Sequence, residues 1–186
     1  MAVTPQVDLR DGAAVSAVVA AGLRDVPDFP QPGVMFKDVT PLLADPHAFA
    51  VVVAALAARH EGVVDLVAGV EARGFVVGAA LAHALGVGFV PVRKAGKLPG
   101  ETVSIAYELE YGSAEIEVHA DALVGGERVL LVDDVLATGG TAAAAWDLLE
   151  RVGAEVVAFE CVVELAFLGG RPRLGGRRVG SLHVVH

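Results

Sequence analysis

The segment that most constrains the fold of this chain spans residues 129–142. Its first four residues, 129–132, are all apolar and predict a fully buried strand of the kind found inside a parallel sheet. Asp133 and Asp134 follow where that strand is expected to end, and a short turn then leads into a run of helix formers at 142–152. In open α/β sheets ligands bind at the carboxyl ends of the strands, so this segment predicts both a fold class and a binding site.

The turn at residues 137–141 reads Ala-Thr-Gly-Gly-Thr. Its two glycines let the backbone turn with N–H groups pointing inward, and its two threonines add hydroxyl donors. The first turn of the following helix has unpaired N–H groups and a partial positive charge, which favour an anion such as phosphate. Asp133 and Asp134 could accept hydrogen bonds from sugar hydroxyls or hold a divalent cation. The pattern alone leaves open an ordinary strand-to-helix turn with solvated or capping aspartates.

The whole string closely resembles the phosphoribosyl-pyrophosphate (PRPP) signature of the type I phosphoribosyltransferases. This resemblance implies an α/β fold with a central, mostly parallel sheet flanked by helices, a small N-terminal hood and a flexible catalytic flap. It implies that Asp133 and Asp134 hold the ribose hydroxyls or metal-bound water. It also implies Mg²⁺ as the cofactor, held mainly through PRPP, with no direct protein ligand assigned. The residues that it places around the 5′-phosphate are Ala137, Thr138, Gly139, Gly140 and Thr141.

Length and composition narrow the class of protein. A chain of 186 residues suits one domain with a substantial core, and its net charge of −9 argues against general nucleic-acid binding. The longest convincing apolar run, 48–58, is far shorter than the ~20 residues of a membrane-spanning helix, and the N-terminus does not read as a secretory signal. Cys161 is the single cysteine and is expected to be a buried thiol. We therefore expect a cytoplasmic protein without nucleic-acid or membrane partners.

Strands alternate with helices along the chain, which predicts a parallel sheet. We interpret the chain as one domain, residues 1–186, with the hood at about 1–45 and the flap at about 94–120. Neither a dinucleotide-binding glycine fingerprint nor a P-loop is present. The predicted helices are 13–23, 45–62, 74–85 and 140–152, and the predicted strands are 66–70, 89–93, 103–111, 116–119, 128–132, 155–165 and a short one within 177–186.

A second strand end carries Glu71-Ala72-Arg73-Gly74. An arginine at such a position is usually a surface ion pair, but here Arg73 offers a planar fork for phosphate oxygens beside a helix start. The segment resembles the pyrophosphate-binding loop of the adenine phosphoribosyltransferases, in which Glu-Ser-Arg-Gly is usual. Ala72 lacks the serine hydroxyl, so only a tight-turn role remains for it. In that family the turn often contains a non-proline cis peptide.

The basic loop, residues 93–97, places three cations in five positions. A solvated surface loop is the alternative, but its context resembles the stretch that leads into the flap of the adenine phosphoribosyltransferases. By that resemblance Arg93, Lys94 and Lys97 lie near the pyrophosphate, and one of them could reach it from a partner subunit. In the same family the glutamate before Tyr-Gly is the proposed proton-transfer residue, which corresponds to Glu110, and Tyr111 helps to close the flap.

The segment 29–43 is the strongest discriminator within the superfamily. It resembles the adenine-recognition hood of the adenine phosphoribosyltransferases, in which an aromatic ring stacks on the base and backbone groups read its edge. Phe36 corresponds to the stacking residue, and Met35 and Lys37 to the backbone contacts, although Lys37 stands where arginine is common. Leu165 is expected to cover the other face of the purine. By composition alone Phe36 is an ordinary core residue.

The resemblance thus implies a pentosyltransferase of purine salvage that converts adenine and PRPP to AMP and pyrophosphate, with Arg73 and Glu110 as catalytic residues. A homodimer is expected from the family alone. Two alternatives remain open at this point: the same fold acting on a 6-oxopurine, and a PRPP-sensing regulator without activity.

Overall fold

The computed structural model describes residues 7–108 and 112–186. Its elements, in chain order, are α1 (Gly12–Gly22), β1 (Arg24–Pro27), β2 (Met35–Asp38), α2 (Thr40–Ala44), α3 (Pro46–His60), β3 (Leu66–Val70), α4 (Arg73–Leu85), β4 (Gly88–Lys94), β5 (Thr102–Glu108), β6 (Ser113–His119), β7 (Arg128–Leu136), α5 (Gly140–Arg151), β8 (Glu155–Leu165), the 3₁₀ turn η1 (Ala166–Leu168), α6 (Gly170–Arg173) and β9 (Val179–Val185).

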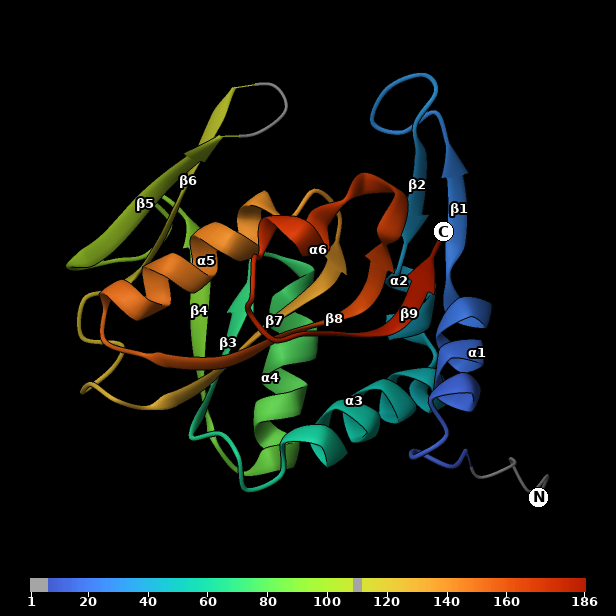
Figure 1. The fold of residues 1–186 in the computed structure, drawn as a ribbon, viewed down its shortest axis with the longest axis horizontal. Coiled ribbons are helices and arrows are strands. Elements are labelled where there is room, and N and C mark those ends of the chain that lie inside the picture. Colours follow the sequence, from blue (N-terminus) through green and yellow to red (C-terminus); the bar gives the residue numbers. More distant parts are fainter. Residues whose placement is uncertain (1–6, 109–111) are drawn as a thin grey trace.

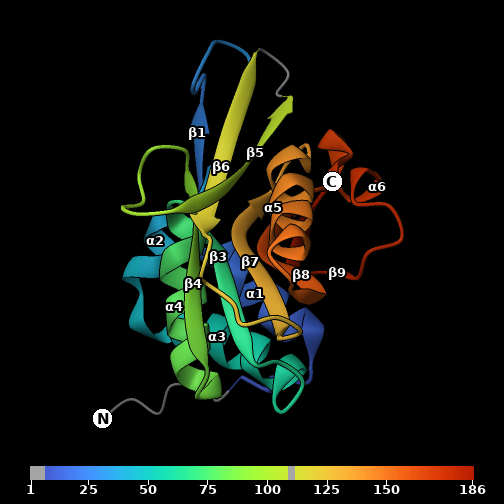
Figure 2. The same cartoon turned by 90° about the vertical axis from the view of Figure 1, so that its left-hand side faces the viewer.

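A central sheet organises the described residues. Its seven strands run in the order β5-β6-β4-β3-β7-β8-β9, and the pairs from β4 to β9 are parallel. Strand β6 runs antiparallel to both β4 and β5, so β5 and β6 form a hairpin at one side of the sheet. Helices α3 and α4 cover one face and α5 covers the other, as the two views show (Figures 1 and 2).

Alternating residues of the inner strands supply the core on both faces. On β3, Val67 packs with the α1, α3 and α4 side, whereas Ala68 packs with the α5 side. On β7, Leu130 and Leu131 divide in the same way. The strands therefore read as continuous apolar runs because both of their faces are covered, as the sequence predicts for a parallel sheet.

Most of the predicted elements are confirmed. Strands 66–70 and 155–165 agree with β3 and β8 to the residue. Asp45 caps α3 by accepting hydrogen bonds from the N–H groups of His47 and Ala48. Gly86 ends α4 in the left-handed conformation.

The sequence gives the wrong end for the strand that carries the acidic pair. Asp133 and Asp134 do not follow β7 but lie inside it, since the strand continues to Leu136. The long neighbouring strand β8 keeps pairing there, with Asp133 opposite Cys161 and Leu136 opposite Glu164. The carboxylates are thus held by a paired backbone rather than by a loop.

Two hairpins rise beyond the carboxyl ends of the parallel strands, one on either side of that edge (Figure 1). One is β5–β6, within the predicted flap. The other is β1–β2, which the sequence did not predict because a Pro/Gly-rich connector hides its short strands. Two ion pairs join its strands: Arg24 to Asp38 at 2.5 Å and Lys37 to Asp25 at 2.6 Å. Hydrogen bonds from Thr40 and Arg24 lower the pKa of Asp38 to about 2.

Candidate active site

A cavity of about 820 Å³ opens at the carboxyl edge of the sheet, between the β1–β2 hairpin and strands β3, β7 and β8. This is the edge at which the fold class predicts a ligand. The cavity brings together residues from five separate parts of the chain. It is lined by Gly33, Val34, Met35, Phe36, Lys37, Val70, Glu71, Ala72, Arg73, Lys94, Asp133, Asp134, Val135, Ala137, Thr141, Leu165, Phe167 and Leu168.

Arg73, the first residue of α4, connects two parts of this cavity. Its Nε donates to Oδ2 of Asp134, a carboxylate that is 5% exposed. Its guanidinium also lies over the ring of Phe36, 5.8 Å from the ring centroid. One cation therefore links the acidic pair on β7 to the aromatic residue of the hairpin.

The acidic pair is electrostatically strained. Burial, followed by the neighbouring charge of Asp134, raises the pKa of Asp133 well above its ordinary value. Gly74 permits this crowding, because a Cβ there would lie 2.9 Å from Oδ1 of Asp133 and 3.0 Å from the carbonyl oxygen of Val132. The glycine of Arg-Gly is thus needed for α4 to begin directly against β7.

The turn between β3 and α4 has the shape that the resemblance implies. The peptide bond between Glu71 and Ala72 is cis. Glu71 accepts hydrogen bonds from the N–H of Lys94 at 3.1 Å and from Nε of Arg93 at 3.2 Å. Burial acts to raise the pKa of Glu71, but these two donors outweigh it and lower the pKa.

The structure divides the three cations of the basic loop. Lys94 is exposed and lines the cavity, whereas Arg93 and Lys97 are not among the described residues that line it. Arg93 instead pairs with Glu71 and donates to the carbonyl oxygen of Lys97 at 3.1 Å. The N–H of Lys97 is held by the buried carboxylate of Glu117 at 2.8 Å. The Arg93 side chain and the Lys97 backbone therefore shape the loop in this structure, and Lys94 lines the cavity.

The phosphate loop, defined as Ala137–Thr141, connects β7 to α5 and includes the first two residues of that helix. It surrounds a second hollow of about 80 Å³, which Ala137 and Thr141 share with the main cavity. Gly139, at the N-cap of α5, has φ +80°, and no described side chain caps the N–H groups of this helix start. The start of this helix therefore suits an anion such as phosphate. Tyr107 of β5 lies 3.1 Å from the hydroxyl of Thr141, hydroxyl to hydroxyl.

The opposite end of the cavity is apolar. Phe36 packs edge-on against Phe29, with ring centroids 5.1 Å apart. Met35 is exposed, and the Lys37 ammonium is taken by Asp25, which leaves only the Lys37 backbone for a ligand. Leu165, at the end of β8, is 7% exposed and also lines the cavity.

Phe167 and Leu168, in η1, line the same apolar end but are not among the residues predicted from the sequence. They are 59% and 39% exposed. The sequence did contain a signal for them. The strand 155–165 was predicted to end at Leu165, and ligands bind just beyond strand ends, so the two large apolar residues that follow could have been predicted to line the site. Glu110 and Tyr111, predicted as site residues, lie outside the described residues.

Within residues 7–108 and 112–186, no three His, Cys, Asp or Glu side chains are grouped so that they could hold a metal ion by themselves. None of the helices in the described part of the chain is both long enough and apolar enough to cross a membrane.

The chain matches the family model described as "Phosphoribosyl transferase domain" over residues 39–173. It is 61% identical to the adenine phosphoribosyltransferase of Kineococcus radiotolerans, over 94% of this chain and 95% of that one. It is 58% identical to the adenine phosphoribosyltransferase of Streptomyces coelicolor, over 90% and 92% of the two chains.

Solved structures give the same result. The adenine phosphoribosyltransferase of Thermoanaerobacter pseudethanolicus superposes with a TM-score of 0.87 at 50% identity, covering 90% of this chain and 98% of that one. The enzyme of Saccharomyces cerevisiae, solved with an imino-altritol bisphosphate and adenine, superposes with a TM-score of 0.87 at 42% identity, covering 91% and 99%.

Proposed function

This chain belongs to the adenine phosphoribosyltransferase family, and we propose how its residues divide the work of that reaction: transfer of the 5-phosphoribosyl group from PRPP to adenine, giving AMP and pyrophosphate. The observation that carries the proposal is the single cavity that joins an aromatic apolar end, a pair of carboxylates and the start of the phosphate loop. These three regions match, in order, a purine, a ribose and a 5′-phosphate.

The apolar end binds the base. Phe36 stacks on one face of adenine, Leu165 covers the other, and the backbones of Met35 and Lys37 read its edge. The pairing of Lys37 with Asp25 supports a backbone role, since that ammonium is already engaged. The yeast relative was solved with adenine, and the relative from Giardia lamblia with 9-deazaadenine.

The middle of the cavity binds the ribose and the leaving group. Asp133 and Asp134 accept hydrogen bonds from the ribose hydroxyls, and the phosphate loop binds the 5′-phosphate. Arg73 exchanges Asp134 for the pyrophosphate when PRPP enters, and Lys94 joins it there. Both cations then stabilise the negative charge that develops on the departing pyrophosphate. Arg93 acts by holding the turn at Glu71 and Ala72, and the backbone of Lys97 holds the basic loop, while the Lys97 ammonium is proposed to reach the pyrophosphate beside Lys94.

The donor set fits Mg²⁺. Magnesium is usually bound through one or two carboxylates together with substrate phosphates and water, rather than by a cage of protein ligands. Asp133 and Asp134 offer such carboxylates, and the described residues contain no larger cluster of acidic or histidine ligands. We propose that Asp133 and Asp134 would hold the ion together with PRPP, mainly through the substrate rather than as direct ligands. When bound, Mg²⁺ supplies charge neutralisation at the pyrophosphate.

Replacing Phe36 with alanine is expected to raise the KM for adenine by about 10- to 100-fold, since stacking on an aromatic ring is worth about 1–3 kcal/mol per base. The KM for PRPP is expected to stay within about threefold, because Phe36 lies at the apolar end. Steady-state kinetics with each substrate varied in turn measure both values. Phe29→Ala is the matched control: this ring touches Phe36 but is not among the described residues that line the cavity, so its effect on KM is expected to be much smaller.

Glu110 is proposed to take the purine proton, and Tyr111 to close the flap over the site. For Glu110→Gln we expect kcat to fall by about 10²-fold or more, the usual contribution of a general acid–base group, with PRPP affinity largely kept. Glu108→Gln is the control, because Glu108 is exposed at the end of β5. An unchanged kcat in Glu110→Gln removes this residue from proton transfer.

The experiment that tests the function is AMP formation from adenine, PRPP and Mg²⁺, run beside hypoxanthine, guanine and xanthine. Rapid turnover with adenine alone is the expected result. Turnover with a 6-oxopurine would keep the fold and the mechanism but overturn the assignment of the base. Saturable PRPP binding without turnover on any base would indicate a regulator.

Three further expectations stay predictions. We propose one phosphoribosyltransferase domain over residues 1–186, with the hood at 1–45 and the flap at 94–120; the sheet shared by both core clusters supports it. A homodimer is proposed from family membership, and light scattering tests it. A cytoplasmic location is proposed in agreement with the free, buried thiol of Cys161.

A further inference from the structure

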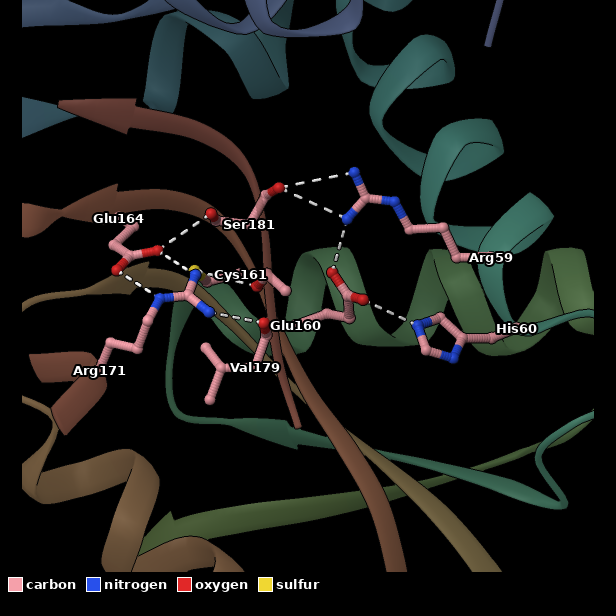
Figure 3. Close-up of polar contacts among 9 residues, drawn as sticks. Arg59, His60, Glu160, Cys161, Glu164, Arg171, Val179 and Ser181 are labelled. Carbon is pink, nitrogen blue, oxygen red and sulfur yellow. Dashed lines mark hydrogen bonds and ion pairs between the residues drawn. The ribbon is translucent and has the colours of Figure 1, made fainter. Parts of the chain in front are cut away.

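Strand β8 carries two buried glutamates, each held by an arginine, and the two arginines reach the strand from opposite sides (Figure 3). Glu160 is 4% exposed and Glu164 is 5% exposed. Buried carboxylates of this kind require partners, because an unpaired charge in the protein interior is strongly unfavourable. The two sets of partners come from different elements, and only one of those elements touches the candidate site.

Glu164 is held by Arg171 of α6. Nε of Arg171 donates to Oε1 at 2.9 Å, and Nη2 donates to Oε2. Ser181 of β9 adds a hydroxyl donor to Oε2 at 3.1 Å. Arg171 also donates from Nη1 to the carbonyl oxygen of Val179 at 2.7 Å. These contacts, the Glu164–Arg171 clamp, tie α6 to two strands at once.

Glu160 is held in a parallel manner by α3. Nη1 of Arg59 donates to Oε2 at 2.9 Å, and Nε2 of His60 lies 2.9 Å from Oε1. Arg59 also donates to the carbonyl oxygen of Ser181 at 3.4 Å. This second clamp joins α3 to β8 and β9, and none of its side chains is among the described residues that line the cavity.

The segment held by Arg171 forms a wall of the cavity. After β8 ends at Leu165, the chain passes through η1, whose residues Phe167 and Leu168 are exposed, and enters the four-residue helix α6. Exposed residues in a short turn have little core packing to fix them. The ion pair immediately behind the turn, in which the Glu164 carboxylate is buried, therefore provides the rigid attachment that this wall otherwise lacks.

The same segment also contacts the phosphate loop through backbone. A Cβ on Gly170 would lie 2.2 Å from the carbonyl oxygen of Ala137 and 3.0 Å from the nitrogen of Gly139. A Cβ on Gly139 would lie 2.4 Å from the carbonyl oxygen of Gly170. Because the two backbones touch without side chains between them, a shift of α6 is transmitted directly to the loop.

We infer, on the basis of the proposed function, that Glu164 and Arg171 are positioning residues that set the wall of the base site and the phosphate loop together. They do so without touching either substrate, since Arg171 faces Glu164 and β9. Arginine suits this role better than lysine, because its planar fork spans both carboxylate oxygens and the Val179 carbonyl in one geometry.

The test compares Arg171→Met with Arg59→Met, which breaks the equivalent clamp on the same strand. Both variants are expected to lower the Tm of unfolding. Arg171→Met is expected to raise the KM for adenine, the KM for PRPP and the Kd for AMP by about tenfold or more, since a misplacement of ~1 Å can cost up to about 10²-fold. Arg59→Met is expected to change these constants by less than about twofold. Arg171→Lys, which keeps the charge but not the fork, is expected to be intermediate and provides a milder variant if Arg171→Met folds poorly.

A second readout does not depend on turnover. Amide hydrogen exchange of residues 137–143 in the free protein is expected to be faster in Arg171→Met and unchanged in Arg59→Met. If both variants change the kinetic constants and the exchange rates equally, the Glu164–Arg171 clamp is only a structural ion pair, and the inference is overturned. If the wild-type protein itself makes no AMP, the proposed function fails, and the exchange comparison still decides the role of the clamp.

Discussion

Replacing both Asp133 and Asp134 with asparagine is expected to reduce turnover by about 10²- to 10⁴-fold. Each carboxylate is proposed to accept a hydrogen bond from a ribose hydroxyl, and hydrogen bonds to charged groups are worth about 1.5–3 kcal/mol each. Two such losses sum to about 3–6 kcal/mol, and every ~1.4 kcal/mol is a factor of ten in rate. Steady-state kinetics of AMP formation measure the effect, and wild-type rates in the double variant would refute the assignment.

The two single variants are expected to separate function from stability. In the folded protein without substrate the pKa of Asp133 is raised, so the folded state retains a proton that the unfolded state has already lost. Wild-type stability therefore falls as the pH rises from the ordinary aspartate pKa of about 3.9 towards the raised value. Asp133→Asn removes this effect, so we expect it to be at least as stable as wild type at pH 7 while turning over far more slowly. Urea unfolding at pH 4 and pH 7 measures the difference.

Asp65→Asn is the matched control for these variants. Asp65 also pairs with an arginine, Arg128, at 2.7 Å, but it precedes β3 at the amino ends of the parallel strands, opposite the site. It is expected to keep wild-type kinetics. A comparable loss of turnover in Asp65→Asn would indicate that removing any aspartate–arginine pair slows the enzyme, and that the acidic pair on β7 has no special role.

The central elements were predictable because their signals are local. An apolar run bounded by Asp65 and Glu71 defines β3, and Asp45 with Pro46 marks the start of α3. The end of β7 was not predictable in this way. Charged residues at 133 and 134 look like the end of a buried strand, and only the length of β8, a neighbour in space, keeps the pairing going.

Within the site, the sequence predicted which residues lie together better than it predicted what their side chains contact. Phe36, Arg73, Lys94 and the acidic pair do meet in one cavity. Arg93 carries the same charge as Lys94, yet in this structure its guanidinium is engaged by Glu71, and the backbone N–H of Lys97 is held by Glu117. Such long-range pairings cannot be read from spacing along the chain.

The region after β8 shows the same limit most clearly. Residues 169–173 read Gly-Gly-Arg-Pro-Arg, which has no periodicity and no motif. Their importance comes from Glu164 behind them and from the backbone of the phosphate loop beside them. Both contacts exist only once the sheet has formed, so the sequence could predict the loop and the base-binding residues but not the element that joins them.

Replacing Gly139 with alanine is expected to raise the KM for PRPP by about 10²-fold, for two separate reasons. Gly139 has φ +80°, a left-handed conformation that costs a residue with a Cβ about 1–2 kcal/mol. Its Cβ would also lie 2.4 Å from the carbonyl oxygen of Gly170, which is too close for any side-chain atom. The phosphate loop and the α6 segment must therefore move apart, and the N–H groups at the start of α5 lose their alignment on the 5′-phosphate.

Gly86→Ala separates these two reasons. Gly86 has a similar φ of +70°, ends α4 away from the site and has no neighbouring atom within 4 Å of the position of a Cβ. Gly86→Ala therefore measures only the cost of placing a residue with a Cβ in the left-handed conformation. Because Gly139→Ala has the same cost, both variants are expected to lose a similar amount of unfolding free energy through it. Only Gly139→Ala is expected to lose affinity for PRPP, measured by steady-state kinetics and by calorimetry. If the two variants bind PRPP equally well, the contact between Gly139 and Gly170 does not set the geometry of the phosphate loop, and the anion site must be sought elsewhere along the cavity.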